Sequence, residues 1–142
     1  MTPFRDQVID DEGQSEMEVT ESEVLCQFPE GMSPNFVVTM DDYKSLEAGT
    51  WVTDAMVDIY LCMMQIVMMS SEDLLKVKVF ETAFYKQMLD TGINLYWTKN
   101  VDIFNKELLL VPSCSSTHWF LIVVVKPGAV ASNGTSIVLL DR

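Results

Sequence analysis

The chain has 142 residues, of which 49% are hydrophobic, and it carries a formal net charge of -12 at pH 7. This length corresponds to one domain or part of one, with ample apolar material for a core. Its nine basic residues are few and scattered, which disfavours a nucleic-acid-binding surface. No apolar run is long enough to span a bilayer and no secretory signal is visible, so we expect neither a membrane protein nor a secreted one.

The negative charge is concentrated at the start of the chain. Residues 1–30 contain nine Asp and Glu residues and a single Arg. Acidic segments of this kind, with Ser and Thr between the charges, usually remain solvated and poorly ordered. We therefore predict an acidic, disordered leader over residues 1–30 and a folded part over residues 31–142.

The first predicted elements lie between residues 35 and 69. Residues 35–39 are typical of a short strand, and a turn or short helix follows until Gly49 ends it. Thr53 is the predicted N-cap of a helix over residues 54–69, and Asp54 suits the positive end of its dipole. Because this helix is apolar nearly all round, we expect it to be buried on most sides.

A second helix is predicted over residues 74–90. Val77, Phe80, Phe84 and Met88 would form one apolar stripe along it, and Gly92 would cap its end. We interpret this stripe as ordinary core packing.

Short apolar runs typical of strands cover residues 108–112, 120–125 and 137–141. The last two are separated by the turn signals of residues 126–128 and 132–134, so an antiparallel hairpin is the simplest arrangement. If its centre lies near residues 129 and 130, His118 faces Asp141. Directly opposed residues share a face with Cβ atoms about 4.5–5.5 Å apart. A register change of one residue would separate them.

His118 is the only histidine of the chain. A carboxylate beside an imidazole fixes its tautomer and stabilises its protonated form, which prepares the imidazole to activate a thiol or a hydroxyl. The alternative is that His118 and Asp141 are only strand-end residues with a structural role.

The three cysteines are odd in number and widely spaced, which favours free thiols in a reducing compartment over disulfides or a zinc site. We expect no metal and no cofactor. Cys114 is the nearest to His118, but no helix N-terminus or cationic neighbour is predicted to favour its thiolate, so we expect it to be structural or incidental. Cys62 falls in the apolar helix and Cys26 in the leader.

Several motifs, in order from about residue 28 to residue 141, resemble the catalytic domain of the SUMO/sentrin-specific proteases. These are ubiquitin-like-protein-specific cysteine peptidases, and the resemblance implies their α+β, papain-like or adenain-like fold, with helices beside a mostly antiparallel sheet. The matching motifs are Trp51-x-x-Asp54, Phe80-x-x-x-Phe84-Tyr85, Trp97-Thr98-x-x-Val101-Asp102-Ile103-Phe104, Leu108-Leu109-Leu110-Val111-Pro112 and His118-Trp119-Phe120-Leu121.

The resemblance implies cleavage after the C-terminal Gly-Gly of SUMO or another ubiquitin-like protein. His118 would act as base and acid, and Asp141 would orient it. Trp51 and Trp119 match two tryptophans that form a narrow tunnel over the diglycine, which admits only residues without a Cβ. Asp54 matches an acidic residue that pairs with a basic patch on SUMO. The alternative for the two tryptophans is burial in the core.

In this family the nucleophilic cysteine and an oxyanion-hole glutamine lie well beyond the aspartate, whereas this sequence ends at Arg142. The resemblance therefore implies the N-terminal half of a catalytic domain, which we expect to lack turnover. We also expect this chain to be marginally stable or to aggregate, because part of its apolar sheet would be uncovered. Three functions stay open, namely part of an isopeptidase, a non-catalytic SUMO-binding module and an acyltransferase on the same scaffold. The implied location is the nucleus or the cytoplasm.

Overall fold

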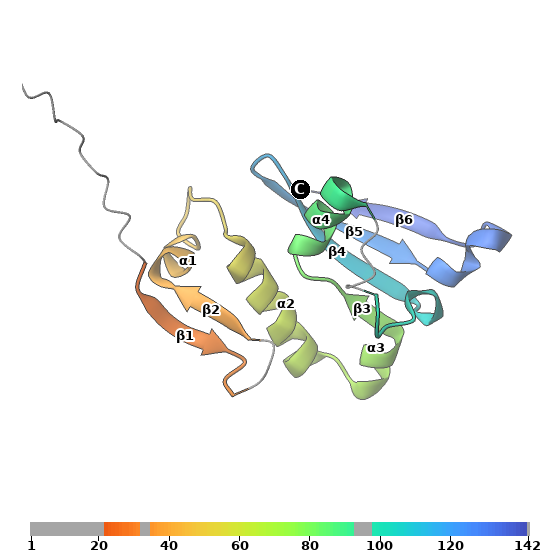
Figure 1. The fold of residues 1–142 in the computed structure, drawn as a ribbon, viewed down its shortest axis with the longest axis horizontal. Coiled ribbons are helices and arrows are strands. Elements are labelled where there is room, and N and C mark those ends of the chain that lie inside the picture. The colour runs from red at the N-terminus through yellow and green to blue at the C-terminus, as the bar shows by residue number, and fades with distance from the viewer. Residues whose placement is uncertain (1–21, 32–34, 93–97, 142) are drawn as a thin grey trace, which may run out of the picture.

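The structure is a computed structural model that describes residues 22–31, 35–92 and 98–141. A central helix, α2 (Asp54–Met68), lies between a two-stranded sheet and a four-stranded sheet (Figure 1). Residues 1–21 of the predicted leader and Trp97 of the family motif lie outside the described residues. Within the described ranges, no helix is both long and apolar enough to span a bilayer.

The smaller sheet precedes α2. Strand β1 (Val24–Phe28) pairs antiparallel with β2 (Phe36–Thr39), and helix α1 (Met40–Lys44) follows directly. The strand predicted over residues 35–39 is confirmed. The leader predicted over residues 1–30 is too long, because β1 lies within it and pairs with β2, with Cys26 opposite Val38 and Phe28 opposite Phe36.

Helix α2 begins after Thr53 as predicted, but the expectation that it is buried on most sides is wrong. None of its residues is fully buried, and Tyr60, Val67 and Met68 are exposed. Helix α2 lies between the two sheets, but neither sheet covers its C-terminal end completely, so its all-round apolar composition does not correspond to all-round burial.

The single helix predicted over residues 74–90 is wrong, because three elements occupy this segment. Helix α3 (Ser71–Lys76) has its own capping box, formed by Ser70 and Asp73, and strand β3 (Val77–Val79) and helix α4 (Ala83–Thr91) follow. The β-branched residues of β3 pair parallel with β4 (Leu108–Ser115), and this tertiary pairing overrides the local helical pattern. The predicted cap at Gly92 is confirmed, with φ +76° and its N–H donating to the Met88 carbonyl at 3.0 Å.

The larger sheet has the order β3-β4-β5-β6, with β5 over His118–Val125 and β6 over Ser136–Leu140. Two 3₁₀ helices, η2 (Ile103–Asn105) and η3 (Pro127–Ser132), flank β4 and β5. Only β3 and β4 run parallel. The α+β fold with a mostly antiparallel sheet is therefore confirmed.

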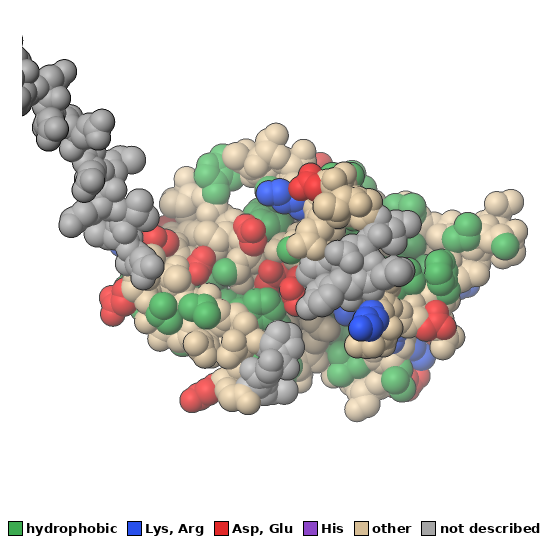
Figure 2. Space-filling model, in the orientation of Figure 1, with side chains coloured by type: hydrophobic (Ala, Val, Ile, Leu, Met, Phe, Trp, Pro, Cys, Tyr) green, Lys and Arg blue, Asp and Glu red, His purple; other side chains and the backbone are tan. Residues whose placement is uncertain are grey.

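The core lies where α4 covers one face of the larger sheet. Phe80 joins Leu109 and Val111 of β4, and its ring stacks on Phe84 with the centroids 4.0 Å apart. Strand β6 is exposed along its whole length, which leaves an uncovered apolar edge. On the face shown in Figure 2, acidic side chains gather over the part that contains α1 and α2, with few basic side chains beside them.

Candidate active site

His118 opens β5, and Asp141 directly follows the end of β6. Strand β6 pairs with β5 so that Leu121 lies opposite Leu140. Continued by one residue, this register places Phe120 opposite Asp141, so the predicted direct opposition of His118 and Asp141 is wrong by two residues. Because side chains alternate with a period of two, the offset leaves both side chains on one face.

The two side chains meet as predicted. His118 Nε2 and Asp141 Oδ1 are hydrogen-bonded to each other, and both side chains are about half exposed, at 51% and 52%. The other ring nitrogen, Nδ1, is then the atom through which His118 can exchange a proton with a reacting group. Such a pair can serve as an oriented general base, and the exposure gives a substrate access to it.

The cysteines are not placed to react with His118. Cys114 lies opposite Trp119 across β4 and β5, whereas His118 lies opposite Ser115, so Cys114 and His118 project from opposite faces of the sheet. Cys62 is in α2, where burial raises the pKa of its thiol and the nearby Glu81 carboxylate adds to this. Cys26 lies on the distant strand β1.

The two candidate tunnel tryptophans lie on different elements. Trp51 is in the loop before α2 and is 68% exposed, so it is not a core residue. Trp119 is the second residue of β5, and its indole Nε1 donates a hydrogen bond of 3.0 Å to the Val52 carbonyl. This bond fastens the loop that carries Trp51 to the strand that carries His118. Asp54 is the first residue of α2 and is exposed.

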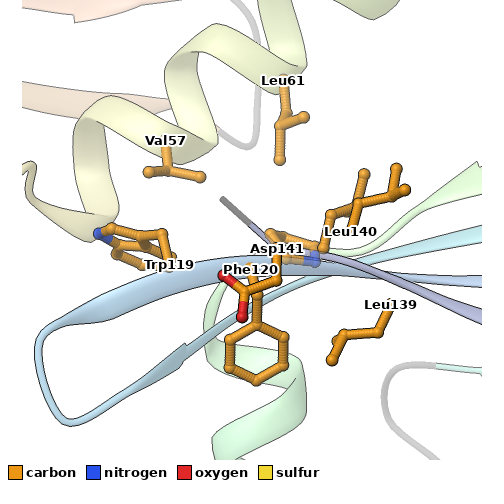
Figure 3. A pocket seen from close by; sticks show the side chains of 9 residues that line it. Val57, Leu61, Trp119, Phe120, Leu139, Leu140 and Asp141 are labelled. Atoms are coloured by element: carbon orange, nitrogen blue, oxygen red, sulfur yellow. The ribbon is translucent and has the colours of Figure 1, made fainter.

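An apolar pocket of about 640 Å³ reaches Asp141 (Figure 3). Helix α2 supplies Val57 and Leu61 on one side, and strands β5 and β6 supply the other. Sequence reasoning missed these two helical residues. Their spacing three and seven residues after Asp54 places them on the same helix face, which is the signal that could have identified them. The complete lining is Val57, Leu61, Pro112, Trp119, Phe120, Leu121, Leu139, Leu140 and Asp141.

A carboxylate in the second turn of α2 ties this helix to α4. Asp58 Oδ1 accepts from the Thr82 N–H and Asp58 Oδ2 from the Thr82 hydroxyl, both at 2.8 Å. Thr82 is the N-cap of α4, so one side chain satisfies a donor at that helix end. Burial raises the pKa of Asp58 and outweighs the two bonds from Thr82, which lower it.

Asp58→Ala is expected to lower the free energy of unfolding by about 1–3 kcal/mol, because both Thr82 donors lose their acceptor. Asp58→Asn keeps an acceptor without the charge and should cost less. A carboxyl pKa raised by folding means that the folded chain holds the proton more tightly, so ionised Asp58 costs stability as the pH rises through its folded pKa.

The stability of the wild type relative to Asp58→Asn is therefore expected to increase from pH 7 to pH 4. Urea unfolding followed by circular dichroism at both pH values measures the three chains. Equal stability of Asp58→Ala and the wild type at pH 7 would contradict the role of this cap.

Comparison with known proteins identifies the family of this chain. Residues 50–141 match the Ulp1 protease family, C-terminal catalytic domain. Human sentrin-specific protease 3 is 41% identical over 90 residues, which are 62% of this chain and 15% of that protein. Human sentrin-specific protease 5 is 34% identical over 98 residues, or 68% of this chain and 12% of the relative. Mouse sentrin-specific protease 6 is 31% identical over 108 residues, or 64% and 10%.

The fold is also that of a solved structure. The crystal structure of a de-sumoylating protease aligns with a TM-score of 0.61 at 21% identity, over 84% of this chain and 48% of the other. The chain thus spans only 10 to 15% of the length of the three curated relatives. The family match covers more than half of the chain and includes Trp51, Trp119, His118 and Asp141. The chain therefore belongs to the Ulp1 protease family.

Proposed function

We propose that this chain is the part of a SUMO-deconjugating cysteine peptidase that holds the histidine and aspartate of the active site. The observation that carries this proposal is the His118–Asp141 pair on the strand that also presents Trp119, in a chain of the Ulp1 protease family. The substrates would be conjugates of SUMO or another ubiquitin-like protein. We also propose that residues 31–142, together with strand β1 that pairs with β2, form the N-terminal part of the catalytic domain, located in the nucleus or the cytoplasm.

In the proposed reaction, a cysteine thiol gives its proton to His118 and attacks the carbonyl carbon of the last glycine. The imidazolium, stabilised by Asp141, then donates that proton to the leaving amine, and water hydrolyses the resulting thioester. Cys114 projects from the face opposite His118, and Cys62 and Cys26 lie on α2 and β1, so we propose that the attacking thiol is none of these three.

Recognition would use the other site residues. Trp51 and Trp119 would enclose the diglycine, because two residues without a Cβ can pass between indole rings where larger ones cannot. Exposed Asp54 would pair with a basic patch of the modifier. The acidic side chains over α1 and α2 would favour the approach of such a patch.

Binding of SUMO by this chain tests the proposal. Mature SUMO, ending in Gly-Gly, is expected to bind more tightly than SUMO truncated before the diglycine, as measured by isothermal titration calorimetry. Trp119→Ala should weaken the binding of mature SUMO at least tenfold, since buried tryptophans are frequent binding hot spots. Trp119→Phe is the matched control that keeps a ring but loses the N–H donor. Its affinity for mature SUMO should lie between those of the wild type and Trp119→Ala.

Far-UV circular dichroism shows whether each variant is folded. A folded wild-type chain that binds neither form of SUMO, or binds both equally, would contradict the proposal.

A second candidate is a SUMO-binding module without catalysis, which the position of Cys114 on the face opposite His118 favours for this chain. The expected result is no release of a fluorogenic amine from the C-terminus of SUMO by the folded chain. Turnover that Cys114→Ser abolishes would overturn this candidate.

A further inference from the structure

The residue that precedes α2 does not cap its own helix. Thr53 occupies the N-cap position, but its side chain makes no capping bond to α2. The Thr53 hydroxyl instead donates to Oδ1 of Asp42 in α1, at 2.8 Å. A threonine at an N-cap usually accepts from its own helix, so this one acts as a connection between two helices.

Asp42 is the centre of this connection. Its Oδ2 accepts from the Thr39 N–H at 2.9 Å and from the Thr39 hydroxyl at 2.8 Å. Burial raises the pKa of Asp42, but the bonds from Thr39 and Thr53 outweigh this effect, and the pKa lies below its ordinary value. Asp42 is therefore a charged acceptor at neutral pH, and hydrogen bonds to a charged group are stronger than neutral ones.

The loop between α1 and α2 is held at both of its ends. Buried Ser45 donates through its hydroxyl to the Asp42 carbonyl, and the same hydroxyl accepts from the Thr53 N–H at 3.3 Å. The Thr50 hydroxyl lies within hydrogen-bonding distance of the Glu47 carbonyl at 2.6 Å and of the Ser45 carbonyl at 2.8 Å. Near the end of the loop that leads into α2, the Val52 carbonyl accepts a hydrogen bond from the Trp119 indole.

Trp51 stands between these attachments. Its side chain is largely exposed, so few packing contacts are available to set its direction. Its backbone is enclosed by hydrogen bonds at residues 50, 52 and 53. The backbone on both sides of Trp51 is thus restrained, and the bond from Thr53 to the charged carboxylate of Asp42 adds to this restraint.

We infer that Asp42 is a positioning residue that, through Thr53, holds Trp51 in place next to Val52, whose carbonyl accepts from Trp119. This inference rests on the proposed function, because Trp51 needs a defined position only if it encloses a substrate. The Asp42 carboxylate bonds to Thr39 and Thr53, so its effect on Trp51 passes through Thr53. The alternative is that the bond only stabilises the fold.

The experiment compares Thr53→Val, which removes the hydroxyl but keeps the branched shape, with Thr53→Ser, which keeps the hydroxyl. Thr53→Val and Asp42→Ala are expected to weaken the binding of mature SUMO about tenfold. Binding of SUMO truncated before the diglycine should not change, because it does not depend on Trp51. Thr53→Ser should match the wild type in both measurements.

Amide hydrogen exchange of residues 50–53 is measured in the same four chains without SUMO. Exchange is expected to rise about tenfold in Thr53→Val and to keep the wild-type rate in Thr53→Ser. If the wild type does not bind SUMO, the proposed function fails, and the exchange rates still decide whether the bond holds the loop. Unchanged exchange in Thr53→Val, or equal losses for both forms of SUMO, would overturn the positioning role.

Discussion

Phe80→Ala is expected to lower the free energy of unfolding by about 3–5 kcal/mol, which is a large fraction of the stability of a small domain. Phe80 is 3% exposed, the least of the core's large side chains, and its ring stacks on Phe84. It also stands where β3 ends, with its N–H bonded to the Leu110 carbonyl at 2.9 Å. Its removal leaves a cavity between α4 and β4 that neither element can fill without moving.

Phe104→Ala is the matched control, since Phe104 is 64% exposed and has little side-chain burial to lose. Its expected cost is within about 0.5 kcal/mol. Urea unfolding followed by near-UV and far-UV circular dichroism measures both variants. Similar losses for the two phenylalanines would contradict the placement of the core under α4.

Gly128→Ala is expected to cost about 3 kcal/mol, at the upper end of the overpacking range. A Cβ at this position would clash with the carbonyl oxygen of Phe104. The Cβ is bonded directly to the backbone of residue 128, and the oxygen belongs to the backbone of residue 104. Neither can rotate away as a flexible side chain can. Gly128 lies in η3, which joins β5 to β6, so any relief of the clash would move β6 and with it Asp141.

Gly49→Ala provides the comparison, because an added Cβ meets no atom within 4 Å there, while the glycine has φ +82°. It should cost only the strain of a left-handed backbone, about 1–2 kcal/mol. Thermal unfolding of the two variants separates the effects. A Gly128→Ala chain as stable as Gly49→Ala would show that η2 and η3 can part freely.

The sequence predicted the elements whose causes are local. The cap at Gly92, the start of α2 after Thr53 and the hairpin of β5 and β6 all follow from residues within a few positions of each other. Strand β3 was missed because its partner, β4, begins 31 residues later along the chain, as the pairing of Val77 with Leu108 shows. Strand β1 was missed because its apolar residues lie in an acidic segment. In both cases tertiary pairing decided the outcome.

In the candidate site, too, the features with local causes were predictable from the sequence, and those that depend on tertiary packing were not. The contact of His118 with Asp141 was predictable from the alternation of side chains, although the exact register was not, because the hairpin loop contains a 3₁₀ helix that the turn signals do not specify. The bond from Trp119 to Val52 depends on how α2 packs on the sheet, which no local pattern encodes. The catalytic role of the pair stays a prediction that binding and turnover measurements must test.

The histidine–aspartate contact and the tryptophan contact of the site differ in the length of the chain segment between their two partners. The His118–Asp141 contact joins residues 23 positions apart, within a single hairpin, whereas the Trp119–Val52 bond joins residues 67 positions apart. The longer closure costs about 1 kcal/mol more in chain entropy, since this cost grows with the logarithm of loop length. The tryptophan side of the site therefore depends on contacts between distant parts of the chain, whereas the contact between His118 and Asp141 forms within one hairpin.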